Sequence, residues 1–127
     1  MKATVQEWID KAEGDFETAS REINVPAHPN YDAVCFHAQQ CAEKYLKAAI
    51  IDKEKEFPRT HDLLMLLDIL LPHEPALEVF RSDLTALSAI GIEVRYPGTC
   101  ADQEDAAVAI KTAEAIRTAM RRIFRLT

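Results

Sequence analysis

The sequence predicts an all-α protein, an antiparallel four-helix up-and-down bundle with one additional short helix. Three observations lead to this fold class. The 6 prolines, at positions 26, 29, 58, 72, 75 and 97, leave five long segments free of proline. Apolar residues in these segments recur every three or four positions, which is the period of a helix. No segment of the sequence is a credible strand, an internal repeat or a low-complexity tract.

Length and composition predict one globular domain spanning residues 1–127. A chain of this size buries roughly two thirds of the surface of its unfolded state. Its content of 48% hydrophobic and 28% charged residues is typical of a soluble protein. No apolar run approaches the ~20 residues that span a bilayer, and the N-terminus lacks the apolar core of a signal peptide. We therefore expect a cytoplasmic protein that does not bind membranes.

The three cysteines indicate neither a disulfide framework nor a metal site. Cys35 and Cys41 lie on one predicted helix and face different directions, so a bridge between them is disfavoured. Together with Cys100 they lack the spacing of metal ligands. We expect reduced thiols in the core, no metal and no cofactor.

The net charge of −6 is unevenly distributed. Residues 111–127 hold five cationic side chains and one carboxylate, so this tail carries +4 and the first 110 residues carry −10. An acidic body argues against a general nucleic-acid-binding protein, whose affinity comes mainly from neutralising phosphates. The arginines of the tail favour the dipole at a helix C-terminus, or they meet an anion locally; the first interpretation is the simpler one.

The first predicted helix spans about residues 4–23 and buries one edge. Its apolar residues form a single stripe: Val5, Trp8, Ile9, Ala12, Phe16, Ala19 and Ile23. Residues 24–30 contain two prolines that cannot continue the helix, and this segment is therefore predicted to be a loop.

The central predicted helix, residues 31–52, organises the others. It contains no Gly or Pro and is rich in helix-forming residues. One face is apolar and built largely from small side chains: Val34, Ala38, Cys41, Ala42, Tyr45, Leu46, Ala48 and Ala49. The opposite face is polar: His37, Gln39, Gln40, Glu43, Lys44 and Lys47. Spacing alone favours a solvated surface. Phe36 lies within this polar face and instead favours an interface or a site.

The segment after the central helix predicts a charged loop, residues 53–62, and then a short helix over residues 61–71. Thr60 and Asp62 are both suitable caps for this helix. Its residues are apolar almost all round, so we expect it to be buried. Pro72 ends it.

Two further helices complete the predicted bundle. Pro75 suits the first turn of a helix that runs to about residue 90, and Gly91 suits its end. After a loop with a Pro-Gly turn, the last helix covers about residues 103–125. It is predicted to bury one side: Ala109, Ala113, Ile116, Met120 and Ile123.

Four motifs occur in a fixed order along these elements. They are FHAQQ-x2-EK-x2-K at residues 36–47, THDL at 60–63, RYP at 95–97, and an acidic, then alanine-rich final helix. At these separations the set resembles the HEPN domain (higher eukaryotes and prokaryotes nucleotide-binding), and the resemblance covers nearly the whole chain. It implies a bundle of four or five helices that associates as a dimer. Many such domains are encoded beside a small nucleotidyltransferase, often as a toxin–antitoxin pair.

The resemblance also bears on catalysis. Ribonucleases of the wider superfamily use an arginine, which stabilises phosphate charge, and a histidine a few residues later, which acts as acid or base. Arg95 stands at the arginine position, but Cys100, Ala101 and Asp102 stand where the histidine is expected. None of these three side chains suits acid–base work near neutral pH. We therefore predict no catalytic residue and a HEPN module without the ribonuclease site.

The RYP and THDL motifs supply candidate ligand-binding residues, each with a structural alternative. Arg95 and Tyr96 either fix their loop, with the guanidinium bonded to carbonyls or a carboxylate, or contact a nucleotide by gripping phosphate and stacking on a base. His61 is either a hydrogen-bonding residue at a helix start or part of a phosphate site there. The structural interpretation is the simpler one for both motifs.

The central helix supplies the remaining candidates. Lys44 and Lys47 either pair with Glu43 or face a ligand, and the sequence leaves both interpretations open. His37 is expected to be a buried hydrogen-bonding group rather than a catalyst. Phe36 is the predicted interface residue.

Two classes of function follow. The first is a homodimeric interaction module, not an enzyme, that binds a small nucleotidyltransferase and a nucleotide. The second is an RNA-cleaving toxin with an altered active site that recruits His37 or His61. RNA is a partner only in the second class.

Overall fold

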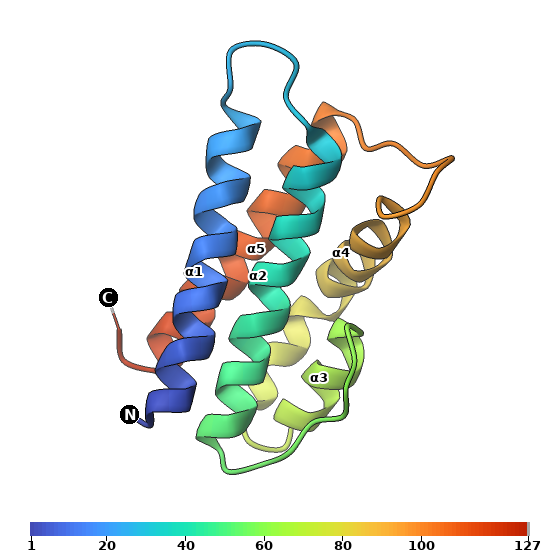
Figure 1. Cartoon of the computed structure of the whole chain (residues 1–127). Helices are drawn as coiled ribbons and strands as arrows, with labels where there is room; N and C mark the ends of the chain where they lie inside the picture. Colours follow the sequence, from blue (N-terminus) through green and yellow to red (C-terminus); the bar gives the residue numbers. More distant parts are fainter. Residues whose placement is uncertain (127) are drawn as a thin grey trace.

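The computed structural model describes residues 1–126, and the elements it forms from them are all helical. In chain order they are α1 (Ala3–Ile23), α2 (Tyr31–Asp52), α3 (Leu63–Leu70), the 3₁₀ helix η1 (Pro75–Phe80), α4 (Arg81–Glu93) and α5 (Gln103–Ile123). The four long helices alternate in direction, and α3 is a short addition beside α2 and α4 (Figure 1). The predicted fold class is confirmed.

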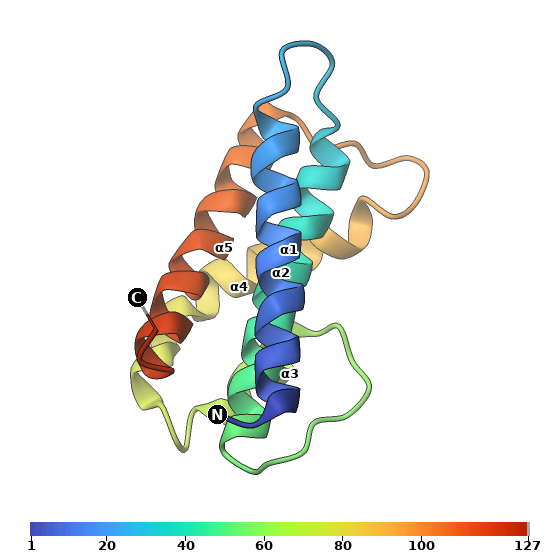
Figure 2. The same cartoon turned by 60° about the vertical axis from the view of Figure 1, so that its left-hand side comes forward.

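Helix α2 lies at the centre of the bundle. It contacts α1, α3, α4 and α5, and its contact with α1 is the most extensive in the protein (Figures 1 and 2). Of its 22 residues, 14 are buried. The predicted apolar face is buried throughout, and small residues there allow the neighbouring helices to approach closely. A helix enclosed on several sides also has to bury part of its polar face, and this decides the character of the site.

Polar side chains cap the helices that frame this centre. Asn30 accepts a hydrogen bond from the backbone of α2, and Asp62 accepts one from the backbone of α3. Asp102 and Asp105 form a reciprocal capping box at the start of α5. These caps fix where each helix begins.

Two predicted helices differ from their expected bounds. Helix α3 begins at Leu63 rather than at residue 61, because Asp62 is its N-cap. The segment expected as one helix from Pro75 to residue 90 is the 3₁₀ helix η1 followed by α4, which continues to Glu93. Gly91 therefore lies inside α4 and not at its end.

Gly91 has a packing reason for lacking a side chain. It is buried where α4 crosses α2, and a Cβ added at this position would lie 2.5 Å from Cγ of Gln39. Any side chain here displaces Gln39 or separates the two helices. The prediction that Gly91 terminates a helix was therefore wrong.

The edge of α1 packs as its stripe predicts, with partial exposure at its aromatic residues. Val5, Ile9, Ala12 and Ala19 are buried, whereas Trp8, Phe16 and Ile23 are partly buried against the core. Among the described residues, no helix is long and apolar enough to cross a membrane. Cys35 and Cys41 are buried, but Cys100 is exposed, so the expectation of three core thiols was wrong for Cys100.

Candidate functional site

The polar face of α2 is largely covered by the chain itself. Gln39, Gln40, Glu43 and Lys47 are buried, because α3, α4 and the segment before α3 pack over this side of the helix. The interpretation of this face as a solvated surface was wrong for these four residues. Since buried polar groups are costly without partners, the four side chains must satisfy one another or their neighbours.

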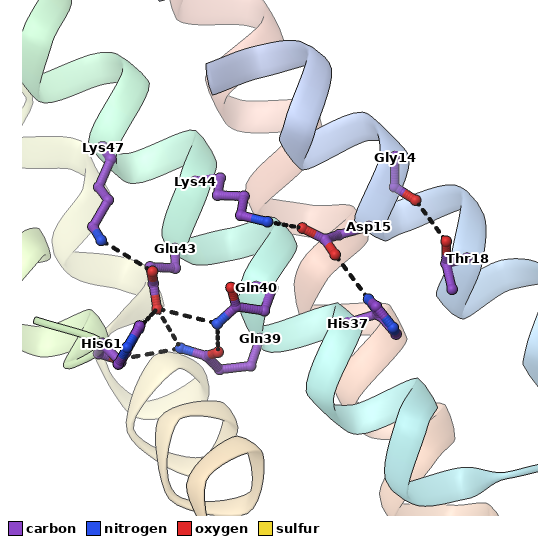
Figure 3. Close-up of polar contacts among 10 residues, drawn as sticks. All are labelled: Gly14, Asp15, Thr18, His37, Gln39, Gln40, Glu43, Lys44, Lys47 and His61. Atoms are coloured by element: carbon purple, nitrogen blue, oxygen red, sulfur yellow. Dashed lines mark hydrogen bonds and ion pairs between the residues drawn. The ribbon is translucent and has the colours of Figure 1, made fainter. Parts of the chain in front are cut away.

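Glu43 is the centre of this buried network (Figure 3). Its Oε2 accepts a hydrogen bond from Lys47 Nζ at 3.0 Å, and its Oε1 lies 2.9 Å from Nδ1 of His61. Gln39 Nε2 donates to the same Oε1 at 3.2 Å and to the backbone carbonyl of His61 at 3.1 Å. Gln40 Nε2 donates to Gln39 Oε1 at 2.8 Å. The network therefore ties α2 to the start of α3.

Lys47 also lies between two aromatic rings. Its Nζ is 5.5 Å from the centre of the Trp8 ring and 5.2 Å from that of Phe57, and the two rings meet edge to face. Cation–π attraction adds to the ion pair with Glu43. Of the two interpretations of Lys47, pairing with Glu43 is the one that the structure shows.

A second carboxylate, Asp15 of α1, holds the other two basic groups of the motif (Figure 3). Lys44 Nζ donates to Oδ2 of Asp15 at 2.6 Å, and Nδ1 of His37 lies 2.8 Å from Oδ1. Lys44 therefore pairs with Asp15 and not with Glu43. The side chain of His37 is 30% exposed, so His37 is a hydrogen-bonding group as expected but reaches the surface.

A third carboxylate, Glu13, joins α1 to α5. It accepts two hydrogen bonds from Arg117, at 2.6 and 2.8 Å, and one from the hydroxyl of Tyr45 at 2.6 Å. The hydrogen bonds from Arg117 hold the pKa of Glu13 below its usual value. Burial and the bond to Glu13 raise the pKa of Tyr45, so the phenol remains a donor. This cluster is structural.

The loop after α4 forms an open pocket with the start of α2. The pocket has a volume of about 280 Å³ and is lined by Asn30, Asp32, Ala33, Phe36, His37, Val94 and Arg95. The guanidinium of Arg95 lies 4.8 Å from the centre of the Phe36 ring, and the ring of His37 meets Phe36 edge to face. The guanidinium of Arg95 forms no hydrogen bond or ion pair with another described residue, and the backbone N–H of Arg95 donates to the carbonyl of Ile92 at 3.2 Å. The guanidinium does not fix the loop by bonding carbonyls, and the prediction of such bonds was wrong.

The positions after Arg95 are occupied by residues with structural roles. The backbone N–H of Ala101 donates to Oδ1 of Asp32 at 2.7 Å, and Asp102 caps α5. Cys100 is exposed. Tyr96 is 64% exposed and does not line the pocket of Arg95. The pocket thus offers a cation, an imidazole and the carboxylate of Asp32, whose Oδ1 accepts the hydrogen bond from Ala101.

The predicted site residues therefore separate into two groups. Phe36, His37 and Arg95 share the open pocket, with Lys44 joined to His37 through Asp15. Lys47 and His61 belong to the buried Glu43 network. Phe36 is only partly exposed because Arg95 lies over its ring, and its place in an interface stays a prediction. Among the described residues, no group of three metal-ligating side chains occurs.

Sequence reasoning missed the two carboxylates of α1, Glu13 and Asp15. Asp15 has a signal in the sequence, since it is three residues after Ala12 and four before Ala19 and therefore lies along the buried stripe. A carboxylate on such a stripe requires a partner, and Lys44 and His37 of the facing helix provide it. Glu13 has a similar signal, since it is four residues after Ile9 and three before Phe16 and borders the other edge of the same stripe.

Comparison with known proteins places this geometry in a family. The HEPN domain model matches residues 5–123. The crystal structure of an archaeal HEPN homologue is similar over 95% of this chain and 97% of that chain, with 27% sequence identity and a TM-score of 0.68. No curated protein matched the chain.

Proposed function

Since this chain belongs to the HEPN domain family, we propose that it is a homodimeric interaction module that binds a small nucleotidyltransferase and a nucleotide and does not cleave RNA. The partnership is of the toxin–antitoxin type that the motifs imply. One observation carries the proposal: none of the three residues that replace the expected histidine, Cys100, Ala101 and Asp102, lines the pocket of Arg95. The backbone of Ala101 is bonded to Asp32, Asp102 caps α5, and Cys100 is exposed. Acid–base cleavage requires a proton-exchanging group in reach of the 2′-hydroxyl or the leaving oxygen.

The open pocket supports the binding part of the proposal. The guanidinium of Arg95 has no hydrogen bond or ion pair with another described residue, so its donors are available to an anion. A guanidinium grips phosphate at two points, and Tyr96, largely exposed on the same loop, is available to stack on a base. The chemical class that fits this loop is a nucleotide.

RNA cleavage is the second candidate function, and one observation favours it. His37 lines the same pocket as Arg95, and Asp15 holds Nδ1 of its ring. A carboxylate that contacts Nδ1 orients the imidazole and leaves Nε2 for proton transfer. His61 is a weaker candidate because it is bonded to Glu43 and lies outside this pocket.

Incubating the purified full chain with labelled single-stranded RNA at pH 7 in the presence of EDTA separates the two functions. We expect no cleavage above the buffer rate. Cleavage that is lost in both Arg95→Ala and His37→Ala would establish the second function and overturn the first.

Calorimetric titration with ATP tests nucleotide binding. We expect Arg95→Ala to weaken ATP affinity by about tenfold, the effect of losing one charge-assisted contact. Arg21→Ala is the matched control, because Arg21 is an exposed arginine of α1 far along the chain from this loop. Equal affinity in the wild type and Arg95→Ala would remove Arg95 from the site. Co-purification with a nucleotidyltransferase encoded beside the gene tests the partner.

A further inference from the structure

Two shallow hollows lie along α5, one beside α4 and the other beside Phe80 of η1, and we call them together the groove. Near the start of α5 the groove encloses about 230 Å³ between Leu87 and Ile90 of α4 and Val108 of α5. Further along α5 a second volume of about 440 Å³ lies beside Phe80. Val108 is 55% exposed. Leu87 is buried and Ile90 and Phe80 are half-buried, so Val108 is the most exposed of these apolar side chains.

Charges of opposite sign lie at the two ends of this groove. The charged residues lining the first volume are all acidic: Asp83, Glu104 and Asp105. Those lining the second are mostly basic: Lys111 and Arg122, with Glu114. None of these six side chains forms an ion pair with another residue that the structure describes. Their charges are therefore available to a partner.

The spacing along α5 places these charges on one line. Glu104 and Arg122 are 18 residues apart, which is five helical turns and about 27 Å, so both project from the same side of the helix. Between them the exposed positions carry the short side chains of Ala107, Val108, Ala115 and Thr118 and the charged ones of Asp105, Lys111 and Glu114. The short side chains leave room for a second helix beside this line of charges.

We propose that a second copy of this chain covers the groove, with its α5 antiparallel to the first about a two-fold axis near residue 113. This inference rests on the homodimer of the proposed function and names the surface through which the two copies associate. About this axis Glu104 faces Arg122 of the partner subunit, and symmetry forms the same pair again. The same axis, to within half a residue, pairs Lys111 with Glu114 of the partner subunit. These charged pairs between residues 111 and 114 lie at the centre of the interface, and Ala115 is the exposed short residue beside them.

Charge complementarity selects a second copy as the occupant. Because α5 is acidic near its start and basic near its end, an antiparallel copy of α5 places opposite charges against each other. A parallel copy would place like charges against each other. One two-fold axis satisfies all four ion pairs at once. An unrelated partner would have to reproduce this pattern independently.

Charge reversal measured by sedimentation equilibrium at low salt tests the pairing. In Arg122→Glu, two attractive pairs become repulsive, and we expect the dimer dissociation constant to rise by about tenfold or more. Glu104→Arg should do the same. The double variant Glu104→Arg/Arg122→Glu restores attraction with reversed polarity, and we expect near-wild-type affinity. Lys11→Glu, an exposed reversal on α1, is the matched control and should leave the constant unchanged.

The other possible outcomes test separately the residue pairing, the location of the interface and self-association itself. Loss of the dimer in both single variants without rescue in the double variant would overturn the pairing of residues 104 and 122. A wild-type dimer that survives both reversals but dissociates in Phe36→Asp would overturn this surface, move the interface to α2 and leave self-association intact. A wild-type chain that stays monomeric at all concentrations would overturn both this inference and the homodimer of the proposed function. Thermal melts of the variants confirm folding, since both residues are exposed.

Discussion

The two ends of the polar face of α2 differ in their surroundings. At one end Glu43 and Lys47 are enclosed, and the donors around Glu43 are bonded within the chain. At the other end Phe36 and His37 meet the open pocket, and Arg95 above them keeps donors free. Less than three helical turns separate the two environments.

Because of this difference, the motif at residues 36–47 contributes to the stability of the fold at one end and to the candidate site at the other. Buried polar networks are stabilising only when they are complete, so the Glu43 end holds α2, α3 and α4 in one arrangement. At the pocket end, Asp15 holds His37 and Lys44 by hydrogen bonds, and the guanidinium of Arg95 stays available to a ligand. Lys47 and His61 therefore belong to the scaffold, and Arg95 and His37 to the candidate site. The four predictions that follow test this division, in order of expected effect.

Glu43→Ala should have the largest effect on stability. The substitution leaves the buried ammonium of Lys47 and two amides without their shared acceptor, and breaking one side of a buried ion pair costs about 3–5 kcal/mol. Urea denaturation measures the loss. Glu54→Ala is the control, since its ion pair with Lys2 is exposed and should contribute less than about 1 kcal/mol. Equal effects would mean that the buried end does not hold the fold.

Gly91→Ala tests the same end from the side of α4. The new methyl group would meet Gln39 Cγ at 2.5 Å, and forced overpacking of this kind costs about 1–3 kcal/mol. Gly14→Ala is the control, because no atom lies within 4 Å of a Cβ at that helical position. Replacing a helical glycine with alanine at such a site stabilises by about 0.5–1 kcal/mol. The two substitutions should therefore shift the urea midpoint in opposite directions.

Glu13→Gln represents the intermediate case, a partly exposed ion pair. Arg117 lowers the pKa of Glu13 in the folded state, so the pair stabilises the fold fully above the ordinary pKa of 4.5 and loses this contribution as the pH falls through the lowered value. We expect the variant to be less stable than wild type by about 1–2 kcal/mol near pH 7. The difference should shrink towards pH 3. A difference that does not change with pH would contradict the ion pair.

Arg95→Ala should have the smallest effect on stability. Its guanidinium lies over Phe36 on an exposed loop, and substitutions at such positions change the free energy of unfolding by about 0.5 kcal/mol or less. Thermal denaturation measures this value alongside the ATP titration. A loss of several kcal/mol would place Arg95 with the scaffold and remove the contrast between the two ends.

Much of the fold was predictable because helical periodicity and proline positions are local signals. The bounds of α2 agree with the predicted residues 31–52, and Asp62 caps α3 as predicted. The split of the fourth helix into η1 and α4 was missed, because the hydrogen-bond pattern of a short 3₁₀ segment leaves no distinct sequence pattern.

Which motif residues belong to the site was predictable, but their burial and their partners were not. The motif residues were identified, but burial of Gln39 and Glu43 depends on which helices cross α2, and that is a tertiary property. The role of Gly91 depends on the same crossing. Partners such as Asp15 for Lys44 lie on another helix, and one sequence without its packing does not pair them.

The bond between Glu13 and Arg117 has a consequence for the order of folding. These residues are 104 positions apart in the chain, whereas α1 and α2 are adjacent and joined by a short loop. Loop-closure entropy favours the α1–α2 hairpin as the early nucleus, with α5 docking after the transition state. Loosening this bond should therefore accelerate unfolding and leave the folding rate nearly unchanged, which places the kinetic lifetime of the folded chain under the control of α5.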